Sequence, residues 1–435
     1  MNSIDKSSIQ RHTERRYTFH RAYVGIRSLH TSCTKIVILI LALVSVFALY
    51  FQCKLAFESI TEYFSFFTIL NNIAFTFLSL VGLFFLFVLF GTPFTANKTR
   101  EALLKAGITN YASEAPVLVS RRLDSKLPGI TIWEFDPCGI PQKLWEDHKE
   151  YIEVALNVLI ADFGWSNDKK YFYLYTAPPQ SAFPEKIEWK PEYLSAQSFV
   201  LLLGQSLIGT ASVDLTKIPH VLLGGSTGSG KSVLLKLMLM QAVEKGAVVH
   251  IADFKGGVDF SEIWHLKCDM CFDMPSLTHI LTTLVSTLEE RKHLFATLGY
   301  PNLDAYNDGT GEHLPRYILA CDEVAEFLDK TGLSKDAKSE IDNIISQIST
   351  IARLGRAFGI HLILATQRPD ATLIPGQIRN NLDGRICGRA DNVLSQIILD
   401  NTTAADQIPK DSRGRFLMYD GKPFQAFWFD EKNWH

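Results

Sequence analysis

The sequence predicts an α/β protein in which a domain with a mostly parallel sheet follows a small α+β domain and an N-terminal pair of apolar helices. Three observations support this. Two long uncharged segments lie within the first 90 residues, a glycine-rich loop stands between an apolar strand and a helix, and buried-type strands alternate with helical segments after it. Apolar residues make up 47% of the 435-residue chain, which excludes a disordered or fibrous protein.

The hydrophobic excess is concentrated near the N-terminus. Fourteen of the 29 Phe lie in the first 100 residues. Two segments there, at about 36–54 and 68–90, are nearly free of charge and long enough to cross a membrane as helices. Because the link between them is short, we expect a two-helix transmembrane hairpin over 36–90. Asn71 and Asn72 are its polar exception, so we expect them near the interface or hydrogen-bonded to another helix.

The distribution of basic residues predicts the orientation of this hairpin. Residues 1–35 form a basic segment, and Lys98, Arg100 and Lys105 follow the second apolar stretch. By the positive-inside rule we expect a two-pass protein of the cell membrane with both termini in the cytoplasm. A cleaved signal peptide is disfavoured, because the basic segment is long and a second apolar stretch follows the first.

Residues 101–198 have the composition of a soluble domain and carry no catalytic constellation. The stretch 150–164 predicts an amphipathic helix that ends at Gly164, and 170–178 alternates aromatic residues as a strand does. We therefore expect a small α+β adaptor domain. The neighbouring Arg121 and Arg122 are interpreted as part of a solvated face.

A glycine-rich loop carries the main functional signal. An apolar strand at 221–223 precedes it, and a helix that stops near Gly246 follows it. The loop matches the pattern GxxxxGK[ST] through Gly225, Ser226, Thr227, Gly228, Ser229, Gly230, Lys231 and Ser232. Backbone N–H groups in such a loop surround phosphate oxygens. We expect it to bind ATP, with Lys231 at the β- and γ-phosphates and the Ser232 hydroxyl on Mg²⁺.

Two later strands end in polar residues that suit catalysis. The strand at 316–323 ends in Asp322 and Glu323, and the strand that begins at residue 359 leaves through Gln367. We expect Asp322 to hold Mg²⁺, Glu323 to polarise the attacking water as general base, and Gln367 to sense the γ-phosphate or orient water. The carboxyl ends of parallel strands meet at one edge, so these groups predict an ATPase domain over 199–435 with its site there.

Several ordered motifs together resemble the FtsK/SpoIIIE family of DNA-pumping ATPases. They are the segment 203–232, the strand that ends at Asp322, and the segment 355–369. The resemblance covers roughly residues 200–430. It implies a RecA-like motor fold, a homo-hexameric ring, and DNA moved through the ring pore by ATP hydrolysis.

The resemblance also implies an arginine that reaches the site of a neighbouring subunit. Arg356 is our expectation for this finger, and Arg353 is its nearest competitor. A surface arginine without this role stays an alternative for Arg356. The family commonly has an arginine where this chain has Gln396, which puts any role of that arginine in doubt.

Departures from the family narrow the expected function. The sequence runs to His435, shortly after a strand-like segment at 414–429, and we expect no winged-helix DNA-reading domain after the motor. It looks most like the coupling proteins of Gram-positive integrative and conjugative elements, which implies delivery of DNA and its relaxase to a type IV secretion channel. Alternatives are a type VII-like protein-secretion ATPase, a chromosome or plasmid segregation motor, and a non-hydrolysing nucleotide-gated scaffold.

Two further features exclude other classes of site. Cys268 and Cys271 form a CxxC, but no second pair of ligands lies nearby, so we interpret them as ordinary strand cysteines and not as a zinc site. Seven Cys suit a reducing compartment. A formal net charge of -3 argues against a static basic DNA-binding surface.

Overall fold

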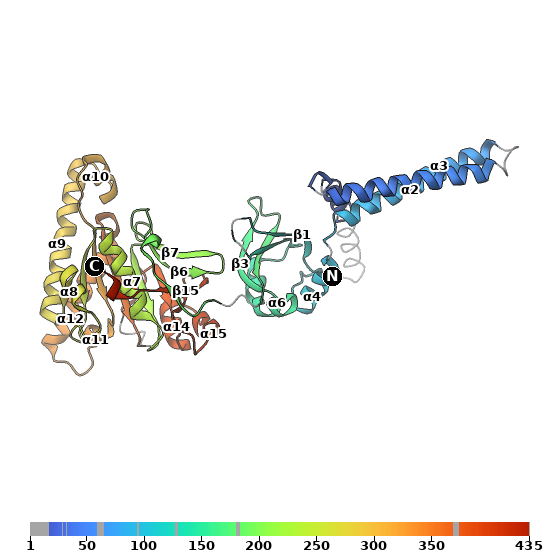
Figure 1. Ribbon diagram of the computed structural model, residues 1–435. Helices are drawn as coiled ribbons and strands as arrows, with labels where there is room; N and C mark the ends of the chain where they lie inside the picture. The colour runs from blue at the N-terminus through green and yellow to red at the C-terminus, as the bar shows by residue number, and fades with distance from the viewer. Residues whose placement is uncertain are drawn as a thin grey trace. The chain divides into compact units, whose positions relative to one another are not determined.

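A computed structural model describes residues 17–27, 29–31, 33–58, 65–93, 95–125, 127, 129–179, 183–368 and 374–434. The chain divides into two compact units, Met1–Ser181 and Ala182–His435. Figure 1 shows the elements of each unit. The domain boundaries predicted at 101, 198 and 199 remain proposals, and residues 183–198 pack with the second unit. Trp189 and Tyr193, for example, lie 5.7 Å and 4.8 Å from the ring of Phe427.

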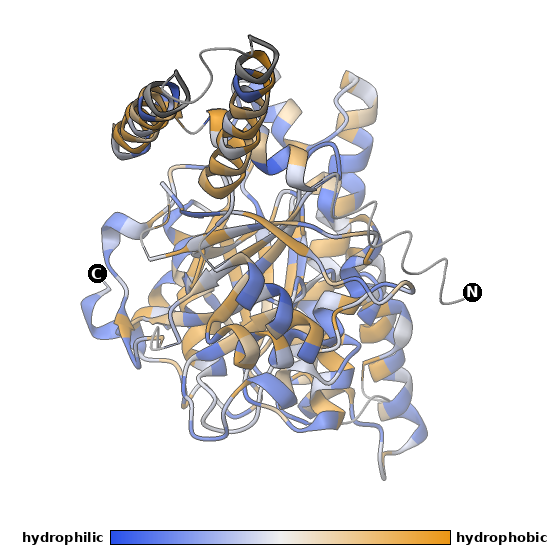
Figure 2. Ribbon diagram, turned by 90° about the vertical axis from the view of Figure 1, so that its right-hand side faces the viewer, coloured by the Kyte–Doolittle hydropathy of each residue, from blue (hydrophilic) through white to orange (hydrophobic). Residues whose placement is uncertain are grey.

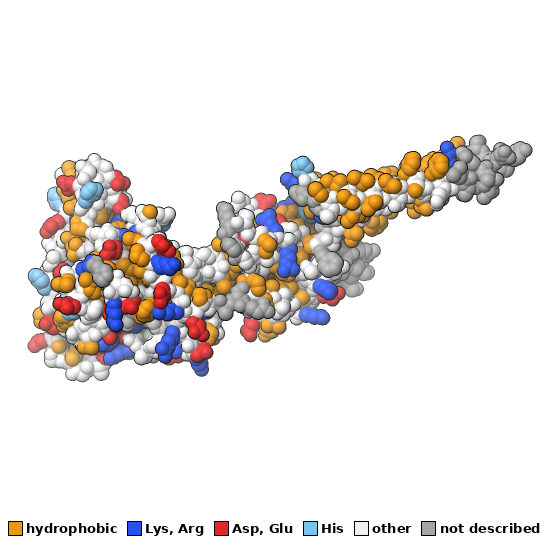
Figure 3. Space-filling view, in the orientation of Figure 1, with side chains coloured by type: hydrophobic (Ala, Val, Ile, Leu, Met, Phe, Trp, Pro, Cys, Tyr) orange, Lys and Arg blue, Asp and Glu red, His pale blue; other side chains and the backbone are white. Residues whose placement is uncertain are grey.

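The first unit begins with the predicted hairpin. Residues 17–27 are helical, and α2 (Cys33–Glu58) and α3 (Ser65–Phe90) follow the short η1 (Leu29–Thr31). Both long helices contain a stretch apolar enough to cross a membrane, Cys33–Lys54 and Ile69–Phe90, and neither stretch is buried. The ribbons of both helices are mostly hydrophobic in Figure 2, and Figure 3 shows hydrophobic side chains along the face that it presents. Asn72 accepts a hydrogen bond from Tyr50 of α2 at 3.5 Å, as one of the two expectations for this residue requires.

The rest of the first unit is an antiparallel sheet packed with three helices. Its strand order is β1-β2-β4-β3, and Trp145, Phe135 and Phe172 form the centre of its core. The elements are α4 (Ala96–Lys105), β1 (Val117–Leu123), β2 (Thr131–Asp136), α5 (Gln142–Asp147), α6 (Lys149–Leu156), β3 (Leu159–Trp165) and β4 (Phe172–Ala177).

The single helix predicted over 150–164 is wrong. Helix α6 ends at Leu156, where Asn157 takes the left-handed conformation at a φ of 52°, and the chain continues as β3. Asparagine tolerates this conformation better than most residues, so it can stop a helix as glycine does. The strand predicted at 170–178 is confirmed as β4.

The second unit is built on one large sheet that is parallel in one half and antiparallel in the other. The strand order is β10-β9-β11-β12-β8-β13-β14-β15-β6-β7, with β5 paired to β15. From β10 to β13 all neighbours are parallel, and from β13 to β7 all are antiparallel. The parallel half is the P-loop NTPase-like α/β fold that the sequence predicts.

The strands and helices of the second unit have these bounds. The strands are β5 (Ile187–Glu188), β6 (Val200–Ser206), β7 (Gly209–Asp214), β8 (His220–Gly224), β9 (Val248–Ala252), β10 (Asp269–Cys271), β11 (Tyr317–Cys321), β12 (Ile360–Thr366), β13 (Gly384–Cys387), β14 (Arg415–Met418) and β15 (Pro423–Trp428). The helices are η2 (Pro191–Tyr193), α7 (Lys231–Glu244), α8 (Glu262–Lys267), α9 (Met274–Leu298), α10 (Leu303–Thr310), α11 (Ala325–Leu328), α12 (Lys335–Phe358), α13 (Gly376–Arg379), α14 (Asn392–Leu399), α15 (Thr403–Gln407) and η3 (Glu431–Asn433).

Helices cover both faces of this sheet, because its central strands are buried on both sides. In β8, Val221 and Leu223 join the core that contains α7 and α8, whereas Leu222 joins the core that contains α9, α12 and α14. Successive side chains of a strand point to opposite faces, so a continuous apolar run fits a strand between two helical layers. The site described next lies at the carboxyl edge of these strands.

Candidate nucleotide-binding site

The glycine-rich loop connects the carboxyl end of β8 to the first turn of α7. Gly228 and Gly230 have φ values of 76° and 99°, in the left-handed region that favours glycine. A side chain at Gly230 would also press on the backbone of Gly414, at 3.1 Å from its nitrogen. The loop therefore needs its glycines, and it leads directly into the positive end of a 14-residue helix.

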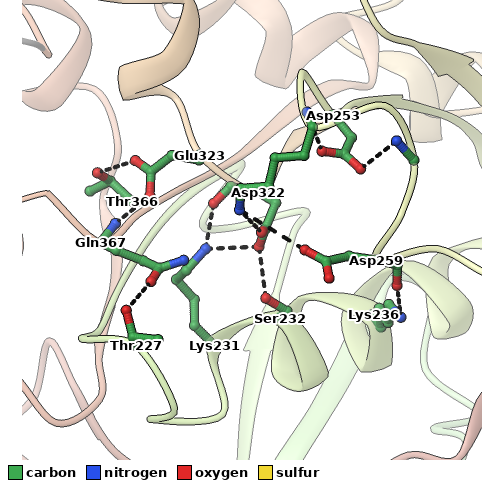
Figure 4. Close-up of polar contacts among 12 residues, drawn as sticks. Thr227, Lys231, Ser232, Lys236, Asp253, Asp259, Asp322, Glu323, Thr366 and Gln367 are labelled. Carbon is green, nitrogen blue, oxygen red and sulfur yellow. Dashed lines mark hydrogen bonds and ion pairs between the residues drawn. The ribbon is translucent and has the colours of Figure 1, made fainter.

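Lys231 reaches across the site to the end of β11. Its Nζ lies 2.8 Å from Oδ1 of Asp322 and also donates to the Asp322 backbone carbonyl (Figure 4). The two side chains are 3% and 4% exposed, so this is a buried ion pair. The structure thus brings together the two residues that the sequence assigns to phosphate and Mg²⁺ binding.

Asp322 is held as a carboxylate, with one oxygen left for a cation. Burial alone would raise its pKa, but Lys231, Lys255 and the hydrogen bond from Ser232 outweigh burial, so that its pKa is lowered. Ser232 Oγ donates to Oδ1 at 3.1 Å. Oδ2 is buried and accepts no hydrogen bond from the described residues. A hydroxyl beside a carboxylate with a spare buried oxygen fits Mg²⁺, which prefers oxygen ligands.

Glu323 is oriented from a different strand. Its Oε1 accepts a hydrogen bond from Thr366 Oγ1 at 2.7 Å, and its Oε2 accepts one from the backbone N–H of Gln367 at 2.8 Å. The side chain of Gln367 in turn accepts from Thr227 Oγ1 of the glycine-rich loop at 2.8 Å (Figure 4). The end of β12 thereby fixes a carboxylate and connects it to the phosphate-binding loop.

The loop after β9 adds a cation that the sequence analysis did not select. Asp253 accepts the backbone N–H groups of Lys255 and Gly257, each at 3.0 Å, which closes a tight turn. Lys255 Nζ then lies 3.6 Å from Asp322 Oδ2. Burial opposes the charge of Lys255, but Asp322 and other carboxylates raise its pKa. The signal in the sequence was the position of Lys255 shortly after the apolar stretch that forms β9.

A second missed residue is Arg389, which braces the glycine-rich loop from the chain after β13. Its guanidinium donates to the backbone carbonyl of Thr227 at 2.6 Å and to that of Lys410 at 2.7 Å. Its own carbonyl accepts the N–H of Ser226 at 2.7 Å. Gly414 N–H donates to Ser229 O at 2.8 Å from further along the chain. No motif marked these residues, because they are distant from the loop in sequence.

Arg356 does not lie with this cluster. It stands near the end of α12, before β12 begins, and its Nε donates to Thr216 O at 3.2 Å. The seven residues of β12 separate that position from Gln367, a length of about 20 Å. Arg353 and Gln396 are likewise on exposed parts of helices. Within one subunit the predicted finger therefore lies at the opposite edge of the sheet, and its role stays a prediction.

The two cysteines of the CxxC lie in a buried part of the sheet. Cys268 and Cys271 are buried beside and within β10, and burial raises the pKa of each thiol to about 12. Burial therefore disfavours the reactive thiolate form of both side chains. In the part of the chain that the structure describes, no group of three or more His, Cys, Asp or Glu could hold a metal ion.

Comparison with known proteins agrees with this geometry. The FtsK/SpoIIIE family model matches residues 185–371. The solved structure of the pCW3 conjugation coupling protein TcpA, in a monomer form with ATPγS, is 34% identical, with a TM-score of 0.57 over 78% of this chain and 96% of that one. DNA translocase FtsK of Campylobacter jejuni is 32% identical over 51% of this chain and 24% of its own length.

DNA translocase SftA of Bacillus subtilis is also similar, with 35% identity across 47% of this chain and 21% of its own length. The chain thus spans about a quarter of the length of these curated relatives, and nearly all of the solved TcpA chain.

Proposed function

The chain belongs to the FtsK/SpoIIIE family, and from this premise we propose that it is a membrane-anchored, ATP-driven DNA translocase that acts as a coupling protein in conjugative DNA transfer. The observation that carries the proposal is the similarity to a conjugation coupling protein across 96% of that solved chain, combined with a complete set of P-loop residues. The relaxase and a type IV secretion channel are the partners that this role requires.

Each of the site residues has a separate role in ATP hydrolysis. Lys231, whose Nζ pairs with Asp322 in this structure, would turn to the β- and γ-phosphates when nucleotide enters. Ser232 and Asp322 would hold Mg²⁺, which neutralises phosphate charge when bound. Glu323, oriented by Thr366 and Gln367, takes the proton of the attacking water.

Translocation requires more than one subunit. Arg356 lies at the edge of the sheet opposite to its own phosphate site, so it suits a finger that completes the site of a neighbour in a homo-hexamer. DNA would pass through the pore of that ring. In the cell, we propose that the hairpin α2–α3 anchors the ring in the membrane with both termini in the cytoplasm.

An ATPase assay with three added substrates tests the proposal. A purified fragment of residues 95–435, which keeps α4 whole, should under conditions that favour oligomers hydrolyse ATP faster with duplex or single-stranded DNA than with a secretion-signal peptide. Lys231→Ala should abolish this activity, and Lys217→Ala, at an exposed lysine, is the matched control.

The same two variants should give different results in a mating assay, in which only Lys231→Ala should block DNA transfer. Stimulation by peptide and not by DNA would replace the proposal with protein secretion. Turnover that survives Lys231→Ala would refute the assignment of the site.

A further inference from the structure

Lys255 lies beside the one oxygen of Asp322 that the other site residues leave free. Oδ1 of Asp322 accepts hydrogen bonds from Lys231 and Ser232, whereas Oδ2 accepts none from the described residues. The Nζ of Lys255 is 3.6 Å from this Oδ2, which is a charge contact longer than a hydrogen bond. The side chain of Lys255 is 37% exposed, against 3% for Lys231. Lys255 is therefore a loosely held cation at the nucleotide site.

The strand order places Lys255 and Gln367 on opposite sides of Asp322. At the carboxyl edge of the sheet, β11 lies between β12 and β9. Asp322 follows β11, Gln367 follows β12, and Lys255 follows β9. Figure 4 accordingly shows Gln367 on one side of Asp322, and the loop after β9 with Asp253 and Asp259 on the other. A phosphate group at the end of β11 would thus be flanked by Gln367 and Lys255.

The turn that carries Lys255 is fixed by its own contacts. Phe254 packs on Phe327, with the ring centres 5.5 Å apart. The two carboxylate oxygens of Asp253 accept the backbone N–H groups of Lys255 and Gly257, each at 3.0 Å. Because the backbone is held on both sides of this residue, the ammonium group can change partners by rotation of its side chain alone.

The present partners of Lys255 leave its hydrogen-bonding capacity unused. Besides Asp322, the nearest carboxylate is that of Asp259, whose Oδ2 is 3.9 Å away and whose side chain is 50% exposed. Both distances exceed the length of a hydrogen bond, so neither carboxylate accepts from the three donors of the ammonium group. A phosphate oxygen within reach would form charge-assisted hydrogen bonds in their place.

We propose that Lys255 is a further catalytic residue that binds the γ-phosphate of ATP. In the nucleotide-free site its charge balances Asp322, and with nucleotide bound it would turn from Asp322 to the γ-phosphate oxygens. There it would stabilise the negative charge of the transferred group during hydrolysis. ADP lacks this phosphate and would not engage Lys255. The inference rests on the ATPase site of the proposed function, to which it adds one residue.

Nucleotide titration of the full-length chain in a neutral detergent tests the proposal, with ATPγS and ADP as separate ligands and Mg²⁺ in excess. Lys255→Gln should weaken the binding of ATPγS by about tenfold, because a hydrogen bond to a charged group contributes at least that much affinity. The affinity for ADP should change by less than about twofold, which also shows that the site is folded. The kcat for ATP should fall by about tenfold or more.

A second variant displaces Lys255 without removing its charge. In Asp253→Asn the amide oxygen can accept only one of the two N–H groups that the carboxylate accepts, so the turn should loosen. The affinity for ATPγS should fall by about threefold, with little change for ADP. Lys292→Gln is the matched control, because Lys292 is an exposed lysine of α9 that also pairs with a carboxylate, that of Glu289 at 3.0 Å. This control should change neither affinity.

The ratio of the ATPγS and ADP affinities decides the outcome. If the ratio is unchanged in Lys255→Gln or in Asp253→Asn, Lys255 is only a counterion of Asp322 and the proposal is overturned. A change of the same size in Lys292→Gln would overturn it as well. DNA stimulation of the wild-type ATPase, measured on the same preparations, reports separately on the proposed translocase. Without that stimulation the translocase proposal fails, while the affinity ratio still tests Lys255.

Discussion

Replacing Lys231 with alanine should destabilise the nucleotide-free motor unit as well as abolish hydrolysis. The Lys231–Asp322 pair is 2.8 Å long, and both side chains are almost fully buried. Alanine would leave the Asp322 carboxylate buried, with Ser232 at 3.1 Å and Lys255 at 3.6 Å as its remaining partners. The free energy of unfolding should therefore fall, and the contacts of Asp322 with Ser232 and Lys255 should limit the decrease.

The magnitude follows from the geometry of the pair. At an effective dielectric constant of about 20, two unit charges 2.8 Å apart attract by about 6 kcal/mol, most of which desolvation offsets. Removing one partner of a buried pair costs about 3–5 kcal/mol. Because Lys255 still compensates part of the charge, we expect about 3 kcal/mol for Lys231→Ala. The neutral double variant Lys231→Met/Asp322→Asn should recover to within about 1 kcal/mol of the wild type.

Urea unfolding of the compact unit 182–435, followed by circular dichroism, measures these differences. The pH dependence gives an independent check. The folded pKa of Asp322 is below its unfolded value near 3.9, so its contribution is present above about pH 4 and is lost as the pH falls further. In Lys231→Ala this acid loss should move to higher pH. Equal unfolding midpoints for wild type and Lys231→Ala, or a double variant as unstable as the single one, would refute the reasoning.

Three further predictions concern other parts of the motor. Glu323→Gln keeps a side-chain oxygen for Thr366, so ATP binding should persist while kcat falls by about 10²–10⁴-fold. If the rate of a single turnover falls by less than about tenfold, Glu323 is not the general base. Arg389→Ala removes a guanidinium that braces the glycine-rich loop and should weaken ATP binding by about tenfold with a smaller change in kcat; nucleotide titration checks this, and unchanged affinity would contradict it. His361 donates to Pro219 O and accepts from Arg316, and burial lowers its pKa to about 3. The stability that neutral His361 contributes is therefore complete above its unfolded pKa near 6.5 and is lost as the pH falls from about 6.5 to 3. Because His361→Gln removes this titrating group, the free energy of unfolding of the variant should fall less steeply in acid than that of the wild type, by up to about 1.4 kcal/mol per pH unit. Identical plots of unfolding free energy against pH for the two proteins would disprove this.

The predictable part of the site was local in sequence. The glycine-rich loop and the carboxylates at strand ends carry their own context, because a strand before and a helix after the loop are required to form the phosphate site. The structure accordingly places Lys231, Ser232 and Asp322 in contact. Arg389 and Lys255 were not predictable in this way, since their roles depend on which distant segments the sheet brings beside the loop.

The secondary-structure prediction failed where one apolar stretch fits both the helical and the strand period. The stretch 150–164 supplies apolar residues that suit both a helix and a strand, and the boundary depends on the conformation of one residue, Asn157. The strand that follows, β3, is held by pairing with β4, a contact that no local pattern reveals. Tertiary pairing thus overrode the helix that the local pattern predicted for the second half of this segment.

The braces on the glycine-rich loop have a consequence for the order of events during synthesis. Ser229 accepts a hydrogen bond from Gly414, and Arg389 holds Thr227, so the loop lacks its supports until nearly the whole chain has left the ribosome. The proposed membrane hairpin emerges first. The glycine-rich loop would therefore acquire these contacts only after the proposed hairpin has left the ribosome.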